Sequence, residues 1–224
     1  VYGGLRHSEQ RHTFKTLSDE NPYIHSFGTN QFILCENSIQ QNLKTTDTDE
    51  LYVVIRNLLG YNEVFEGSIA YGTVQNFAHF VGFDTLSYNR FLVNYIDKLT
   101  QFHINANYDL KINNIMSINV NADFYKWDTL AYHKPNFTCE LSAPINLRNK
   151  IKVNPTLSYV GKRFYDIDKE LSAQFHANLG LYYNYTQNIG AYLQLNNLTN
   201  SKQEFWKDYR EVGFNGLFGL NYSF

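Results

Sequence analysis

The sequence lacks any long apolar run. No stretch approaches the roughly 20 consecutive apolar residues that a membrane-spanning helix needs, and the mean hydropathy is −0.41. A helical membrane protein is therefore excluded. A protein that crosses a membrane with strands is not excluded, because only alternate residues of such strands face lipid. The chain also lacks an excess of positive charge: its formal net charge is −2, which argues against a nucleic-acid-binding protein.

Cysteine is scarce as well, and histidine is scattered. The two cysteines, Cys35 and Cys139, lie far apart and outside any metal-ligand spacing, and whether they pair stays open. Of the seven histidines only His7 and His12 lie close together. Solvated histidines are the more common interpretation of such a pair, and a metal the rarer one. We therefore expect no metal and no cofactor.

Nothing in the sequence predicts an enzyme. No GxSxG pattern of a nucleophile elbow is present, and neither cysteine has an adjacent base. We expect no catalytic residue.

Aromatic residues, by contrast, are abundant. The chain has 18 Tyr and 17 Phe but only two Trp. Both Tyr and Phe are good strand residues, and Tyr is suited to a membrane–water interface. The composition therefore favours a β protein.

The last residues show the pattern most clearly. Counting back from Phe224, every second residue is apolar or small, whereas the positions between them are mostly small or polar. A period of two is the signature of a strand with one apolar face. A strand that ends on an aromatic residue such as Phe224 is typical of the last strand of an outer-membrane β-barrel.

The same alternation recurs along the chain and predicts about ten strands. They lie near residues 1–7, 51–56, 65–72, 89–110, 116–124, 137–145, 151–159, 171–183, 189–196 and 214–224. A slip of the alternation at residues 97–99 predicts a β-bulge. Pro144 and Pro155 fall inside predicted strands, and proline cannot donate to the ladder. Pro144 can sit at a strand end, whereas Pro155 requires a bulge, or else the strand predicted there is partly wrong.

The connections alternate between short and long. Tight turns are predicted near 111–114, 146–150 and 185–188, and longer loops at 74–88, 127–135, 161–170 and 197–213. A long external loop is expected at about residues 8–48. Up-and-down transmembrane barrels have this asymmetry, with short periplasmic turns and long external loops.

These observations predict a fold that is all-β: an antiparallel up-and-down transmembrane β-barrel formed by residues 1–224. The polar strand faces would point into the lumen. They carry most of the charged and imidazole groups of the strands, namely Arg56, Glu66, His103, Asp109, Asp123, Glu140, Lys152 and His176. Such groups can line a solute path, although a structural network that holds the barrel wall is the more common role.

The C-terminal part also resembles a known family. Leu193-Gln194-Leu195-Asn196-Asn197-Leu198-Thr199-Asn200, then a loop and a Gly-rich last strand ending in Phe224, resembles the C-terminal end of TonB-dependent outer-membrane receptors. The richness in Asn and Tyr, with His133-Lys134-Pro135-Asn136-Phe137 before one strand, resembles Bacteroidetes-type members. The resemblance covers about the last 110 residues and is suggestive before them.

The resemblance implies a place in the outer membrane of a Gram-negative bacterium. It also implies the partners: the lipid bilayer, the barrel-assembly machinery, TonB contacted through a plug domain, and other outer-membrane or surface proteins. Neither a plug domain nor a TonB-contacting box is visible in residues 1–224. We therefore expect either the C-terminal part of a larger barrel, with the chain cut from a longer precursor, or a plugless relative.

Candidate site residues are few. Trp206, Tyr209 and Arg210 lie in a loop that mixes aromatic rings with charge, and they are candidates for ligand contact or for an external aromatic girdle. Phe218, Leu220, Tyr222 and Phe224 are expected to anchor the last strand in the membrane. The resemblance adds that they form the signal that the assembly machinery recognises.

The favoured function is a TonB-dependent receptor or transporter that moves a solute through the lumen. One alternative is a non-transporting outer-membrane barrel that acts as a subunit of a larger surface or secretion complex. A soluble β-sandwich binding module is a third hypothesis.

Overall fold

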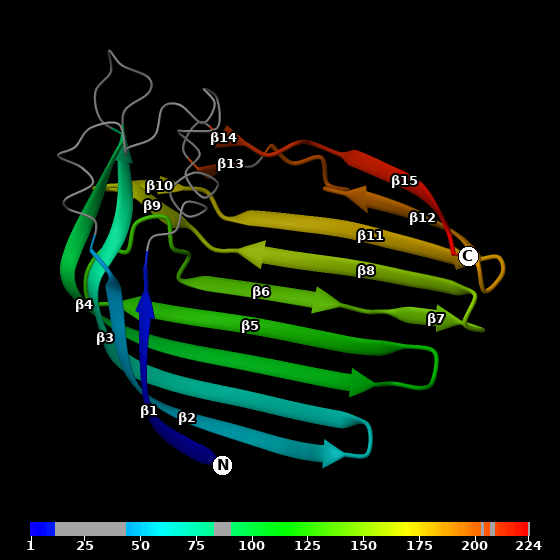
Figure 1. The fold of residues 1–224 in the computed structure, drawn as a ribbon, viewed down its shortest axis with the longest axis horizontal. Helices are drawn as coiled ribbons and strands as arrows, with labels where there is room; N and C mark the ends of the chain where they lie inside the picture. Colours follow the sequence, from blue (N-terminus) through cyan, green and yellow to red (C-terminus); the bar gives the residue numbers. More distant parts are fainter. Residues whose placement is uncertain (12–43, 83–90, 203, 207–208, 224) are drawn as a thin grey trace.

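The protein is built almost entirely from one curved antiparallel sheet (Figure 1). A computed structural model describes the chain except for residues 12–43, 83–90, 203, 207, 208 and 224. Within the described ranges no helix is long and apolar enough to cross a membrane. The expected all-β, antiparallel fold is confirmed.

The sheet follows the chain from one edge to the other, in the order β1-β2-β3-β4-β5-β6-β8-β11-β12-β15, with β7 pairing with β8. Its strands are β1 (Tyr2–Gln10), β2 (Thr46–Gly60), β3 (Glu63–Gly82), β4 (Phe91–Lys111), β5 (Ser117–Trp127), β6 (Phe137–Ser142), β7 (Ile145–Leu147), β8 (Ile151–Val160), β11 (Gln174–Asn184), β12 (Ile189–Asn196) and β15 (Asn215–Tyr222). Two small hairpins stand apart: β9 (Arg163–Asp166) with β10 (Lys169–Leu171), and β13 (Glu204–Trp206) with β14 (Tyr209–Arg210).

The short connections gather at one end of the sheet, which we call the turn end and which lies to the right in Figure 1. They join β2 to β3, β4 to β5, β7 to β8 and β11 to β12. The connections from β5 to β6 and from β8 to β11, together with both small hairpins, lie at the opposite end, which we call the loop end.

Several predicted boundaries change. The expected loop at 74–88 is wrong over its first part, because β3 continues to Gly82 and pairs with β4 along its whole length. The expected external loop is also shorter than 8–48, because β1 reaches Gln10 and β2 begins at Thr46. The strand predicted for 171–183 divides into β10 and β11.

The predicted bulge at residues 97–99 is also wrong. The register between β3 and β4 is continuous, with Gln75 opposite Lys98 and Phe77 opposite Ile96. Asn76 adopts a positive φ of 50° at this point, and its side chain donates to the carbonyl of Thr45 at 3.0 Å. The distortion at this point therefore lies in β3, at Asn76, and β4 gains no residue.

The two prolines explain an interruption in the sheet. β6 and β7 pair with β8 in one common register, and the residues that separate them are Ala143 and Pro144. Pro155 keeps its place in β8 without a register shift, so the expected bulge is absent. Ala143 donates to the carbonyl of Pro155 at 3.1 Å, but Pro155 has no N–H to return the bond. The ladder is therefore broken where the prolines meet.

One face of the sheet is apolar and exposed. Its rows run across the strands, as in the row Val53, Ile69, Ile104, Phe124 and Phe137. Many of its large side chains are among the exposed hydrophobic residues: Leu5, Leu51, Ile55, Leu157, Phe175, Phe218, Leu220 and Tyr222. A continuous apolar surface of this kind is the lipid-facing surface of a transmembrane barrel.

The other face is polar, as predicted. On it Glu50 is only 6% exposed and accepts hydrogen bonds from Arg6 Nε at 3.0 Å and Gln101 Nε2 at 2.6 Å. His103 Nε2 lies 2.8 Å from Asp123 Oδ1, and Arg56 Nε lies 3.7 Å from Glu66 Oε2. These pairs belong to the structural network that the sequence predicts for the lumen.

Gly72 makes room for this network. It stands between Glu50 and Gln101 in the sheet register. A Cβ at Gly72 would collide with the carbonyl oxygen of Asp49 and would lie 2.8 Å from Glu50 Cγ. Only glycine lets β2 and β3 approach so closely.

We therefore expect Gly72→Ala to lower the thermal midpoint of the folded barrel by several degrees, because backbone and not a flexible side chain must move. Heat-modifiable mobility on semi-native gels measures this midpoint. Gly60→Ala is the matched control, since no atom lies within 4 Å of its added Cβ. Equal midpoints for the two variants would contradict the packing argument.

Candidate functional site

The candidate ligand loop of the sequence forms the small β13–β14 hairpin at the loop end. Two side chains bind its backbone. Arg163 Nη2 donates to the carbonyl of Glu204 at 3.1 Å, and Gln174 Nε2 donates to the same oxygen. Arg163 is 2% exposed and Gln174 is 1% exposed. A buried double anchor of this kind fixes the hairpin relative to β11.

Burial sets the electrostatics of this anchor. It lowers the pKa of Arg163, an effect that the charge of Glu211 partly offsets. The neighbouring His133 donates its backbone N–H to the carbonyl of Phe164 at 2.7 Å. Burial and then the charge of Arg163 lower the pKa of His133 to about 4. His133 is therefore neutral at physiological pH.

A hollow of about 620 Å³ opens between the two small hairpins, and Tyr165, Gln174, Lys202, Glu204 and Arg210 are among the residues that line it. The Arg210 guanidinium lies 3.7 Å from the Glu204 carboxylate. On the β9–β10 side, Lys162 pairs with Glu170 at 2.9 Å. The hollow thus presents both charge signs together with amide and phenol groups.

The motif that carried the family resemblance has a structural role. Asn197 is 5% exposed and adopts a positive φ of 50°, a conformation that asparagine tolerates. Its Oδ1 accepts from the Ser201 N–H at 3.1 Å, and its Nδ2 donates to the carbonyl of Val212 at 3.2 Å. One side chain thus fastens the start of the β12–β15 connection to its end, and we call this arrangement the Asn197 clamp.

Asn200 makes a similar contact, with a φ of 49° and an Oδ1 that accepts from the Phe214 N–H at 3.0 Å. The connection is also tied to the polar face, because His176 Nδ1 lies 3.3 Å from Glu211 Oε2. The sequence reasoning missed these contacts. The sequence did carry a signal for them, namely the two asparagines Asn197 and Asn200 before the Gly-containing last strand.

The structure describes the side chain of only one of the three predicted ligand residues. Arg210 is exposed and lines the hollow. The backbones of Trp206 and Tyr209 pair in the hairpin, but their side chains lie outside the described part of the structure. Contact with a ligand therefore stays a prediction.

In the last strand, Phe218, Leu220 and Tyr222 project from the exposed apolar face, and Phe224 lies outside the described residues. Their role as an assembly signal stays a prediction. Cys139 is a free cysteine, whereas Cys35 and His12 also lie outside the described residues. His7 contacts Asp49, with Nδ1 2.7 Å from Oδ1. Among the described residues no group of three or more His, Cys, Asp or Glu side chains is arranged to hold a metal ion.

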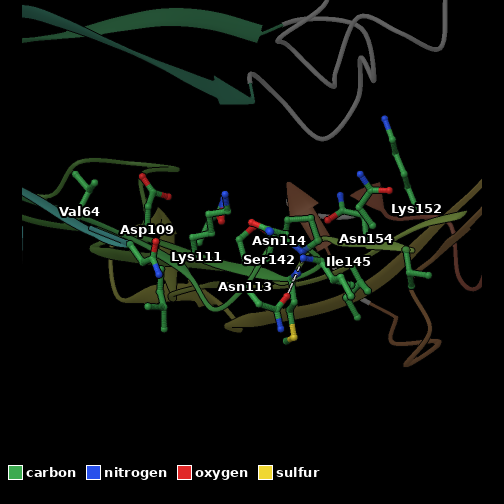
Figure 2. Close-up of a pocket in the computed structure, with 18 of the residues that line it drawn as sticks. Val64, Asp109, Lys111, Asn113, Asn114, Ser142, Ile145, Lys152 and Asn154 are labelled. Atoms are coloured by element: carbon green, nitrogen blue, oxygen red, sulfur yellow. Dashed lines mark hydrogen bonds between the residues drawn. The ribbon is translucent and has the colours of Figure 1, made fainter. Parts of the chain in front are cut away.

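A second and larger hollow, of about 900 Å³, lies at the turn end, where the ladder is broken at Pro144. Figure 2 shows Asp109, Lys152 and Asn154 rising from the same side of the sheet, which is the polar face. A third hollow of about 330 Å³ adjoins it and includes Arg56, Glu66 and Glu140. The two hollows share Val64, Asp109, Asn119 and Ser142, so they form one continuous surface, which we call the lumenal trough.

Solved structures share this architecture. The ferric enterobactin receptor of Pseudomonas aeruginosa, as a G324V mutant, matches 81% of this chain and 32% of its own length, with 14% identity and a TM-score of 0.62. A copper transporter matches 100% and 37%, with 12% identity and a TM-score of 0.70. The ferric-catecholate import receptor of E. coli K12 matches 98% and 32%, with 12% identity and a TM-score of 0.61. No protein-family model and no curated protein matches the chain.

The fold is that of the barrel of a TonB-dependent outer-membrane receptor. The chain spans about a third of the length of these solved structures. It therefore corresponds to a portion of such a barrel, as the sequence predicts, and the open order from β1 to β15 agrees with a portion.

The Asn197 clamp makes a direct prediction. Asn197→Ala leaves the Ser201 N–H and the Val212 carbonyl without their partner, so we expect the β12–β15 connection to become several-fold more sensitive to protease. Asn197→Asp keeps the acceptor and loses the donor, and we expect an intermediate sensitivity. Limited proteolysis with mass spectrometry of the fragments checks both. Unchanged cleavage within residues 197–214 of Asn197→Ala would refute the clamp.

We expect the half-buried His133 to make the connection between β5 and β6 sensitive to acid. A histidine whose folded pKa is lowered binds fewer protons when folded, so its contribution to stability is lost as the pH falls from about 6.5 toward about 4. We expect faster amide hydrogen exchange in residues 128–136 at pH 5 than at pH 7, after correction for the intrinsic rate. In His133→Gln this pH difference should shrink; if it persists, His133 is not its cause.

Proposed function

We propose that the chain forms part of the barrel of an outer-membrane receptor or transporter of the TonB-dependent type, which moves a solute through the lumen. The observation that carries the proposal is the two-faced sheet. Its apolar face suits lipid, and its polar face carries hollows at both ends. Hollows on a polar inner face suit a path for a solute through the lumen.

The edges of the sheet support a larger barrel. Within the described residues, β1 and β15 each pair on one side only. Unpaired backbone groups cannot face lipid without a cost of several kcal/mol each. We propose that further strands of a longer protein close the sheet, as large transporters with plugged lumens require.

We assign solute capture to the loop end. The two hairpins stand on a rigid base made by Arg163, Gln174 and the Asn197 clamp, and Arg210 is exposed at their rim. A preorganised loop loses little conformational freedom on binding. The similar structures are those of a ferric enterobactin receptor, a ferric-catecholate import receptor and a copper transporter. For this chain we propose that the loop end captures a solute.

Cysteine labelling tests which end of the sheet faces the outside of the cell. In a background with Cys35→Ser and Cys139→Ser, we expect Arg210→Cys to react with a membrane-impermeant maleimide in intact cells. Asn149→Cys, in the turn between β7 and β8, should react only after the outer membrane is permeabilised, because short turns face the periplasm. Labelling of Asn149→Cys in intact cells would reverse the orientation and remove the capture site from the outside.

Receptor function itself is tested by association with TonB. The intact protein extracted from outer membranes should exceed 26.2 kDa, the mass of these 224 residues, and should be retained by the immobilised periplasmic domain of TonB. Lack of retention, together with absence of conductance in a planar bilayer, would favour the non-transporting subunit instead.

A further inference from the structure

The lumenal trough carries charges of both signs that nothing else in the described chain neutralises. Asp109 and Glu140 have no ion-pair or hydrogen-bond partner among the described side chains, and neither do Lys111 and Lys152. All four project from the polar face, according to the sheet register. Lumenal charges elsewhere in this sheet are paired, as Arg6 with Glu50 and His103 with Asp123 show. Unpaired charges of both signs on one surface point to an external partner.

The charges are ordered along the strands. Glu140 is opposite Ser158 in β8, and Lys152 lies six residues further along that strand, about 20 Å toward the turn end. Lys111 lies two residues beyond Asp109 in the same direction, about 7 Å. The trough is therefore acidic at mid-wall and basic at the turn end. A ligand that matches it has a cationic and an anionic end separated by roughly 7–20 Å.

The wall around these charges suits amide groups. Asn113, Asn114, Asn119, Asn146 and Asn154 line it, and each asparagine amide both donates and accepts hydrogen bonds. The buried Oδ1 of Asn146 has no hydrogen-bond partner among the described residues.

The proline break adds two backbone acceptors. Ser117 donates to the carbonyl of Pro144, and Ala143 donates to the carbonyl of Pro155. Neither proline can return a hydrogen bond, so the Ser117 and Ala143 carbonyls have no ladder donor. A ligand with N–H groups would supply these acceptors with donors.

We infer that the lumenal trough binds a zwitterionic, amide-rich solute of the oligopeptide type, with its amino group toward Asp109 and Glu140 and its carboxylate toward Lys111 and Lys152. The volumes of about 900 and 330 Å³ suit such a ligand. An extended tetrapeptide spans about 13 Å between its charged ends. The inference rests on the proposed function, because it takes the lumen as the path of the solute.

The test uses tetra-alanine with free termini and the intact protein, extracted from outer membranes in detergent. Isothermal titration calorimetry compares this peptide with its N-acetylated and its C-amidated forms. We expect the free peptide to bind about two- to fivefold more tightly than either blocked form, since each block removes one solvent-exposed charge pair. Equal affinities of the three peptides, or no binding of any, would overturn the inference.

Two double variants test which charges of the trough contact the amino end and the carboxylate end of the peptide. In Lys111→Gln/Lys152→Gln, amidation should no longer weaken binding, whereas acetylation still should. Asp109→Asn/Glu140→Gln should show the reverse. Lys126→Gln is the matched control, because Lys126 is exposed on the opposite face at the loop end, and it should behave as the wild type. If both double variants keep both preferences, the peptide binds elsewhere and the trough is not its site.

The two proposals fail separately. Retention by TonB without discrimination among the peptides refutes the oligopeptide inference and leaves the receptor in place. Discrimination among the peptides without retention by TonB refutes the TonB-dependent function and leaves the trough as a binding site.

Discussion

The structure depends on one constraint: inside a bilayer every backbone N–H and C=O needs a partner within the protein. The sheet meets this constraint strand by strand from β1 to β15: each strand on this path between the two edges pairs on both sides, and β7 pairs with β8. Side chains then have only two directions to take, toward lipid or toward the lumen. The apolar exposed face and the polar face with its ion pairs follow from that division.

The break between β6 and β7 is the exception that shapes the lumen. Proline cannot donate to the ladder, and both prolines of this region fall at the same interruption. The break lies on the wall of the 900 Å³ hollow and leaves two carbonyl groups free for another donor. Strand carbonyl groups lie in the plane of the sheet, so the break borders both faces. Our proposal is that a polar ligand on the lumenal face supplies donors to these carbonyl groups.

The loop end follows a different principle, in which buried polar side chains take the place of an apolar core. Arg163 and Gln174 hold the β13–β14 hairpin by one carbonyl group, and Asn197 closes the connection that contains it. The described chain has few buried apolar residues, so directional bonds fix the loops. Each bond is made in a buried place where its loss leaves an unsatisfied group, which is why single side chains carry so much of the loop geometry.

The strands, their two faces and the fold class are predictable from the sequence alone, because a period of two assigns each side chain to one face without knowledge of its neighbours. The tight turns and the C-terminal motif are predictable in the same way. Register is different, since it depends on which distant segments pair. The register brings Pro155 opposite the interruption that contains Pro144. It lets β3 continue to Gly82 by pairing with β4. It also brings Asp109, Glu140, Lys111 and Lys152 into one trough. Those four charges come from β4, β6 and β8, so no local pattern could have predicted that they meet.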